Sequence, residues 1–167
     1  MPASTAFRLY AEASGSIQTG LAAANTSSIP ATVTLELNRL DGSSTGLTGT
    51  INVGPNGQAA MFLNQIQGFG SLQLPFRGVL RVSSAASISI LGLRGRYNER
   101  NDFLITTTQP INETLPASTS PLLFPHFADS GGYTTQFILF SGIAGQSSSG
   151  MLQLFSESGQ TINLPLQ

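Results

Sequence analysis

Short segments of alternating apolar and polar residues, separated by turn-forming sequences, limit most strongly what this chain can fold into. In residues 31–39 (ATVTLELNR), Val33, Leu35 and Leu37 alternate with polar side chains. A period of two places successive side chains on opposite faces of a β-strand, one buried and one solvated. The dipeptide Asp41-Gly42 follows directly and is typical of a tight turn. The segment therefore predicts a strand that ends in a turn.

The same pattern predicts further strands along the chain. They span residues 76–82, 87–93, 103–108, 133–141 and 150–156. Turn-forming sequences rich in Gly, Asn, Ser and Pro occur at 54–57, 68–71 and 144–150. Only residues 57–68 have a pattern that suits a helix, and a short one. Many short strands with turns between them predict an all-β fold, an immunoglobulin-like antiparallel β-sandwich.

Composition excludes several chemistries. The chain has no cysteine, which excludes disulfides, zinc–thiolate sites and thiol nucleophiles. All seven basic residues are arginines, so there is no lysine for a Schiff base or a phosphate-binding loop. The net charge of −1 gives no electrostatic footprint for nucleic acid. Charged residues make up 9% of the chain against roughly 25% in average soluble domains, yet 40% is hydrophobic, so the chain is expected to fold.

The location of the protein is inferred from its composition and its first residues. No apolar run approaches the roughly 18–20 residues of a membrane span, so we expect no membrane insertion. The first residues, MPASTAF, lack the basic and apolar regions of a signal peptide. A lysine-free β protein rich in Ser, Thr and Gly is more often exported. We therefore expect a secreted or cell-surface protein whose signal peptide is absent from this sequence.

Two parts of the chain resemble each other across a proline-bearing stretch. Residues 14–25 align with 130–141 at an offset of 116, and residues 32–42 with 149–159 at an offset of 117. These matches predict a complete β-sandwich repeat over 1–108, a Pro-rich linker over 109–125, and the first half of a second repeat over 126–167. Half a sandwich has open edges. It must pack on the first repeat, pair with another chain, or continue in a longer protein.

Three stretches carry a family resemblance. GLAAANTSSIPATVTLEL, FRGVLRVSSAASISILGLRGRYNERNDFLITT and LLFPHFADSGGYTTQFILFSG resemble a repeat module of large secreted proteins of soil bacteria, of unknown function. In those proteins the module often lies beside immunoglobulin-like domains, near the carboxyl end. The resemblance spans nearly the whole chain and implies fold class and export. It carries no catalytic residues over to this chain.

Charge is concentrated in residues 91–102 (LGLRGRYNERND). This stretch supplies the candidate site residues Arg94, Arg96, Tyr97, Glu99, Arg100 and Asp102. Arg94 and Arg96 extend one face of a strand, and the acidic residues follow in an expected turn, where bidentate arginine–carboxylate pairs form easily. One interpretation is a salt-bridged brace at the junction of the two repeats. The alternatives are a site for an anion, an acidic glycan or a partner, and catalysis.

Catalytic and metal sites have little support in the sequence. His126 is the only histidine, with Asp129 and Ser130 nearby, but neighbours along a strand or turn rarely converge into a triad. We expect no cofactor, although calcium requires only oxygen ligands. Its candidate ligands, none of them in a D-x-D-x-D run, are Asp41, Glu99, Asp102, Asp129 and Glu157.

We therefore expect a secreted, non-enzymatic module with a structural, adhesive or protein-interaction role. Its partners would be other protein modules or copies of itself. A carbohydrate-binding module is the alternative, in which Tyr10, Tyr97 and Tyr133 stack on sugars and Arg94 and Arg96 also contribute to the site. A third hypothesis is a hydrolase of the esterase or lactonase type that uses His126.

Overall fold

The protein is an all-β chain dominated by one antiparallel, curled sheet. The computed structural model describes residues 3–116, 120–128, 131–141 and 149–162. The strands of the sheet are β1 (Ser4–Ser14), β2 (Ile17–Ala24), β3 (Ala31–Arg39), β4 (Ser44–Val53), β5 (Gln58–Phe62), β6 (Phe76–Tyr97), β7 (Phe103–Thr108) and β8 (Ile111–Asn112). The one helical turn is η1 (Leu63–Gln65), and no helix among the described residues is long and apolar enough to cross a membrane.

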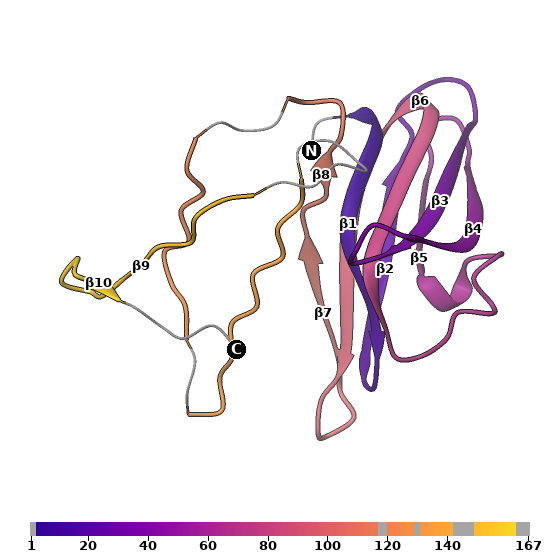
Figure 1. Cartoon of the computed structure of the whole chain (residues 1–167). Helices are drawn as coiled ribbons and strands as arrows, with labels where there is room; N and C mark the ends of the chain where they lie inside the picture. Colours follow the sequence, from indigo (N-terminus) through magenta and orange to yellow (C-terminus); the bar gives the residue numbers. More distant parts are fainter. Residues whose placement is uncertain (1–2, 117–119, 129–130, 142–148, 163–167) are drawn as a thin grey trace.

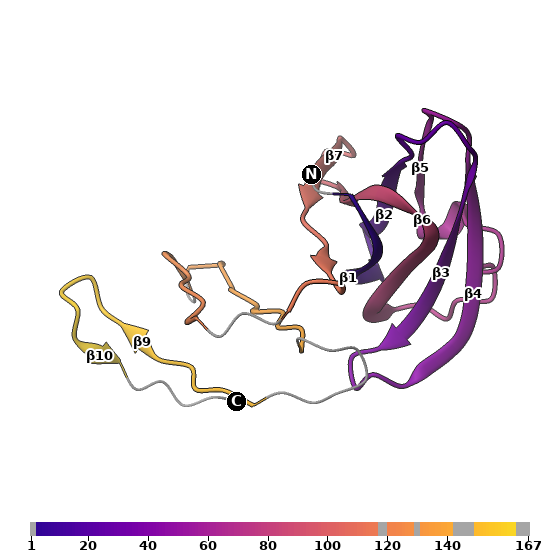
Figure 2. The same cartoon turned by 90° about the horizontal axis from the view of Figure 1, so that it is seen from above.

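Strand β6 organises the sheet because it pairs with different strands along its two halves. Its first half pairs with β1, from Phe76 opposite Ala13 to Ser83 opposite Ala6, and with β3 on its other edge. Its second half pairs with β2, and with β7 on its other edge. All these pairings are antiparallel and β1 is antiparallel to β2, so the two halves of β6 run in opposite directions. The sheet therefore curls around β6, as the view from above shows (Figure 2).

The concave side of the curled sheet holds one hydrophobic core. Alternate residues of β1, β3 and β6 are buried there, among them Phe7, Leu9, Leu35 and Leu80, each at most 2% exposed. The loop after η1 closes one side of the core with Ile66 and Phe69. The polar residues of the same strands lie on the other face, as the period of two predicts.

The strand predictions succeed where a partner strand is available. Residues 31–39 form β3 and residues 103–108 form β7, with the predicted bounds. The two segments 76–82 and 87–93 are parts of the single strand β6. The short helix suggested for 57–68 is confirmed only as the single turn η1, because residues 58–62 pair with β2 as strand β5. A short apolar run suits either structure, and the open edge of β2 decides it.

The second part of the chain contains much less strand than predicted. The strand predicted for 133–141 is wrong: Tyr133 forms an isolated bridge and residues 134–141 have no regular structure. Within 150–156, only Leu154–Phe155 forms a strand, β9, which pairs with β10 (Thr161–Ile162). This hairpin lies away from the curled sheet (Figure 1). The predicted linker 109–125 contains β8, which pairs with β1. The assignment of 126–167 to a second repeat stays a prediction.

Candidate functional site

One row of side chains on β1 carries the buried charge of the molecule. Phe7, Leu9 and Ala11 face the core, so Arg8 and Glu12 project from the opposite face. Both are nevertheless buried, at 7% and 4% exposed. A buried charge is costly unless it is paired and hydrogen-bonded. The partners of these two side chains therefore define the site.

Glu12 binds an arginine from each half of β6. Its Oε1 lies 3.1 Å from Nε of Arg77, and its Oε2 lies 2.8 Å from Nη1 of Arg94. The backbone N–H of Glu12 donates to Oγ1 of Thr19, at 2.8 Å, across the β1–β2 hairpin. Because β6 folds back on itself, its first and last parts lie close together, and the carboxylate of Glu12 reaches an arginine in each. Glu12 therefore links the start and the finish of β6.

A second carboxylate, Glu113, binds two further arginines. One oxygen lies 3.0 Å from Nε of Arg8, and the other lies 3.0 Å from Nε of Arg81. Arg81 also reaches Glu36 on β3, at 3.3 Å. The hydrogen bond to Glu113 is the main reason that the pKa of Arg81 is raised, and Glu36 adds to it. These pairs join β1, β3 and β6 to the residue that follows β8.

Arg8 also contacts the second part of the chain. Its Nη2 donates to the carbonyl oxygen of Ser141 at 2.6 Å, and its guanidinium lies 5.8 Å from the ring centroid of Phe140. Beside this contact is a cavity of about 290 Å³, whose walls include Tyr10, Arg94 and Phe140. The hydroxyl of Tyr10 is buried and has no hydrogen-bond partner among the described residues. Burial raises the pKa of Tyr10, and the charge of Glu12 raises it further.

The charged residues predicted from 91–102 do not form one cluster. Arg94 belongs to the Glu12 pair, whereas Arg96 pairs with Glu99 at 2.6 Å on the exposed surface. Asp102 accepts a hydrogen bond from the side-chain amide of Asn98 within the β6–β7 turn. Arg100 lies in the same turn, and no carboxylate among the described residues pairs with it. The ion pairs of Arg94 and Arg96 involve only residues of the curled sheet and of its β6–β7 turn, whereas the contact with residues 140–141 comes from Arg8.

Tyr97, the remaining predicted site residue, belongs to an aromatic cluster at one end of β6. Its ring centroid lies 5.0 Å from that of Phe103 on β7, and Phe103 lies 5.8 Å from Phe62 on β5. A Cβ at Gly95 would approach the rings of Phe103 and Phe62 to 2.6 and 3.1 Å. Glycine there lets the rings lie against the strand. Tyr97 and Phe103 remain 47% and 43% exposed, which makes this cluster a surface feature.

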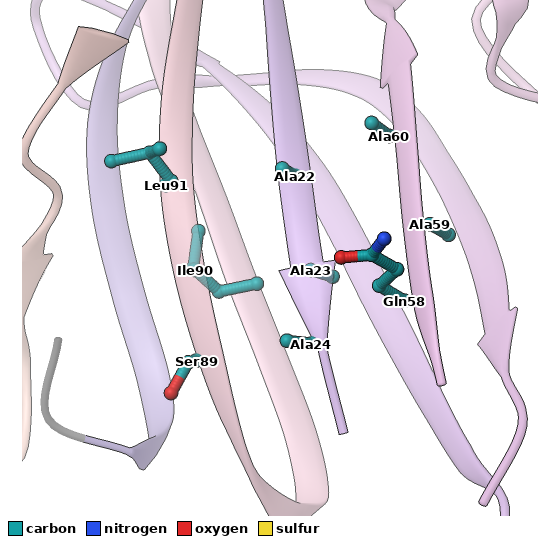
Figure 3. A pocket seen from close by; sticks show the side chains of 9 residues that line it. All are labelled: Ala22, Ala23, Ala24, Gln58, Ala59, Ala60, Ser89, Ile90 and Leu91. Carbon is teal, nitrogen blue, oxygen red and sulfur yellow. The ribbon is translucent and has the colours of Figure 1, made fainter. Parts of the chain in front are cut away.

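A hollow of about 490 Å³ lies over β2, β5 and β6, lined by residues 22–24, 58–60 and 89–91 (Figure 3). In the register of these strands, Ala22 stands beside Leu91 and Ala60, and Ala24 beside Ser89 and Gln58. Most of these side chains are short and leave the ribbon bare, as Figure 3 shows. The hollow is lined mostly by apolar side chains and has few polar groups that could orient a ligand.

The residues considered for catalysis and metal binding are dispersed. His126 is exposed, and its proposed partners Asp129 and Ser130 lie outside the described residues. Within the part of the chain that the structure describes, no group of three or more His, Asp or Glu side chains could hold a metal ion. The carboxylate oxygens of Glu12 and Glu113 each contact a guanidinium group, and these ion pairs link neighbouring strands.

Sequence reasoning missed most of the buried network. Glu12, Arg8, Glu36 and Glu113 were not singled out, because each stands alone among uncharged neighbours. A signal was present in residues 76–82, where Arg77 and Arg81 occupy the face opposite Leu80. Two like charges on one face of a strand indicate acidic partners on adjacent strands. The sequence does not say which strands are adjacent.

Comparison with known proteins adds evidence on the fold. No family model matches the sequence, and no curated protein matches it. The crystal structure of Thermotoga maritima 1070 is similar, with a TM-score of 0.53 at 12% sequence identity. The match covers 67% of this chain and 97% of that chain. At this identity the likeness concerns the arrangement of strands alone.

Proposed function

We propose that this chain is a non-catalytic interaction module that joins other protein chains, including copies of itself, by adding strands to the edge of its sheet. We further propose that its curled sheet is a β-sandwich of the immunoglobulin-like kind. The folding back of β6 supports the sandwich, because it brings two groups of strands around one core. The family resemblance supports secretion.

The observation that carries the proposal is strand β7. All six of its residues are exposed, it has no charged side chain, and it pairs with β6 on one edge. Phe103, Leu104 and Ile105 are 43%, 51% and 57% exposed. An uncharged, apolar edge strand is a template for pairing with another chain, and proteins that stay apart usually protect such edges with charge or proline. Strand addition of this kind is a common mode of recognition.

Size-exclusion chromatography with light scattering tests this proposal. We expect the chain to self-associate at high micromolar concentrations, and Ile105→Lys to return it to a monomer because a charged edge resists pairing. Thr50→Lys, which places the same charge on the exposed face of β4, is the matched control and leaves association unchanged. A chain that stays monomeric at all concentrations, or that associates equally well as Ile105→Lys, contradicts pairing through β7.

Carbohydrate binding is a second candidate, favoured by the half-exposed and mutually packed rings of Tyr97 and Phe103. Exposed aromatic rings stack on the apolar faces of sugars. A glycan array tests it directly. We expect Tyr97→Ala to remove any signal, and an array without binding at millimolar ligand rules this candidate out.

A further inference from the structure

The cavity of about 290 Å³ lies at a gap in the strand pairing of β1. One edge of β1 pairs with β6 along most of its length. Along the other edge, β8 pairs with β1 at residues 7–8, and β2 pairs with it at residues 13–14. Residues 9–12 therefore have no partner strand on that edge among the described residues, and Tyr10 from this stretch lines the cavity.

The walls of the cavity come from both parts of the chain. They include residues of β1, β2, β6, β7 and β8, together with Ile138 and Phe140. All of these residues belong to the described ranges. Ligand pockets are usually lined mainly by apolar side chains, with a few polar groups that orient the ligand. The cavity has both, because Leu93 and Ile111 are apolar, whereas Tyr10 and Arg94 carry polar groups.

Arg94 gives one end of the cavity a positive charge. Its Nη1 lies 2.8 Å from Oε2 of Glu12, but Glu12 is shared with Arg77, so these three side chains carry a net charge of +1. The Nε and Nη2 groups of Arg94 have no hydrogen-bond partner among the described residues. The side chain is 35% exposed and lines the cavity, so these donors are open to a ligand there.

The other end of the cavity is apolar. Ile111 pairs with Arg8 in the strand register, and the ring of Phe140 lies 5.8 Å from the guanidinium of Arg8. Arg8 and Glu12 are about 13 Å apart along β1, since a strand rises about 3.3 Å per residue. The cavity therefore runs from the cationic end beside Glu12 to an apolar end beside Arg8.

Tyr10 stands between the two ends, and its hydroxyl lacks a partner. The hydroxyl is buried and makes no hydrogen bond within the described residues. Burial raises the pKa of Tyr10, so the phenol is protonated at neutral pH and can donate. Buried polar groups nearly always have a partner. The hydroxyl therefore indicates an acceptor that the described part of the chain does not supply.

We propose that this cavity binds a small monocarboxylic acid with a compact hydrocarbon body. Its carboxylate accepts hydrogen bonds from the free N–H groups of Arg94 and from the hydroxyl of Tyr10. Its single negative charge balances the net charge of the Glu12 group. Its hydrocarbon body packs against Ile111 and Phe140 at the apolar end.

Other ligand classes fit this cavity less well. A second negative charge would lie at the apolar end without a partner, and a sugar would place several hydroxyls there without acceptors. An aliphatic acid such as hexanoate avoids both costs. The site is separate from the open edge of β7, so the inference does not rest on strand pairing.

An NMR titration of the full chain with hexanoate at neutral pH tests the inference. We expect a Kd of about 1 mM or lower, which a ligand of this size can reach. Hexanol, which has no charge, binds at least about tenfold more weakly, and hexylamine, a cation at this pH, does not bind. In the wild-type chain, hexanoate shifts amide signals within 9–12, 93–94 and 108–111, whereas those of β3 and β4 stay in place.

Arg94→Gln is the informative variant, and Arg77→Gln is its matched control. Each removes one of the two arginines that bind Glu12, but only Arg94 lines the cavity. We expect Arg94→Gln to raise the Kd for hexanoate at least about tenfold, the effect of one hydrogen bond to a charged group. Arg77→Gln changes the Kd by less than about threefold, because its exposed charge is screened by solvent and salt.

Four results contradict the carboxylate site. Hexanoate that does not bind at millimolar concentration removes it, and so does equal binding of hexanol. Amide shifts confined to residues outside the cavity place the ligand elsewhere, and this wild-type map decides the question even where Arg94→Gln does not fold. Equal effects of Arg94→Gln and Arg77→Gln mean that Arg94 does not contact the ligand. Ile105→Lys keeps the two proposals apart, because it abolishes self-association through β7 and leaves hexanoate binding unchanged.

Discussion

Glu12 on β1 binds Arg77 and Arg94, which stand near the beginning and the end of β6. Its side chain is 5% exposed, whereas those of Arg77 and Arg94 are 57% and 35% exposed. The buried carboxylate of Glu12 thus forms ion pairs with both halves of β6 and holds them against β1. Arg94, one of the charged residues of 91–102, is thus one of the two arginines that Glu12 binds.

Replacing this carboxylate tests its contribution to stability. We expect Glu12→Gln to lower the free energy of unfolding by about 2 kcal/mol, because a largely buried ion pair loses one partner and the exposed arginines soften the loss. Glu99→Gln removes the surface partner of Arg96 and changes stability by less than about 0.5 kcal/mol. Urea unfolding followed by circular dichroism measures both. Equal losses in the two variants would mean that burial of Glu12 contributes nothing.

Glu113 offers a second test, because it neutralises Arg8, which is 7% exposed. Glu113→Gln leaves that guanidinium buried without a counter-charge, and we expect a loss of about 3 kcal/mol. Adding Arg8→Met to this variant recovers part of the loss, since an apolar side chain needs no partner there. Thermal unfolding of the two variants provides the comparison. A double variant less stable than Glu113→Gln alone contradicts the pairing.

The buried hydroxyl of Tyr10 predicts a dependence on alkaline pH. Its pKa is raised from 10.0 by burial, so the folded chain keeps the phenol neutral while the unfolded chain ionises. The stabilisation is complete below pH 10 and is lost as the pH rises through the raised pKa. We expect Tyr10→Phe to reduce this alkaline loss. At neutral pH it stabilises the fold by up to about 1 kcal/mol, because an unpaired hydroxyl is removed.

Tyr133→Phe is the matched control for Tyr10→Phe, since Tyr133 is 72% exposed. The measurement is the denaturation midpoint between pH 8 and pH 11.5. If both phenylalanine variants follow the wild-type profile, the hydroxyl of Tyr10 is solvated in the folded chain.

Alanine substitutions at two glycines with positive φ distinguish the cost of backbone strain from the cost of a steric clash. Gly46 has φ of +78° and open space around its Cα, so Gly46→Ala costs about 1–2 kcal/mol for the left-handed backbone alone. Gly68 has φ of +101°, and a Cβ there would collide with the carbonyl oxygen of Thr48. We expect Gly68→Ala to lower the free energy of unfolding by more than about 3 kcal/mol, because the new Cβ would push the loop after η1 away from β4. Similar midpoints for the two variants in urea would show that this loop adapts freely.

The sequence predicts strands well where the alternation is regular and a partner is present. β3 and β7 have the predicted bounds, and the all-β class is confirmed. Residues 133–141 alternate similarly but pair with no strand among the described residues, and isolated strands are not stable in water. Residues 57–68 show the opposite error. The sequence pattern suggests a helix there, but Gln58–Phe62 pairs with the edge of β2 and forms a strand.

The buried ion pairs could not be predicted, because each depends on which strands are neighbours. Nothing in the sequence near Glu12 indicates that Arg77 and Arg94 will both lie beside it. That contact follows from the reversal of β6 between Ser83 and Ser89. The sequence of β6 reads as a continuous run of strand-forming residues and does not indicate this reversal. Local patterns fix the faces of strands, whereas topology fixes the charge partners.

The reversal of β6 also bears on how the chain folds during synthesis. β1, β2 and β3 leave the ribosome before β6 and share few pairings with each other, since β1 and β2 pair only at Ala13–Gln18 and Ser14–Ile17. β1 and β2 have their longest pairings with the strand that ends at Tyr97, whereas β3 pairs with that strand along one edge and with β4 along the other. Non-local pairing of this kind slows folding and prolongs exposure of apolar strands. Until Tyr97 emerges, β1 has no partner along most of its length, and β2 and β3 have only β5 and β4 along one edge each, so we expect chaperone demand to fall sharply once it does.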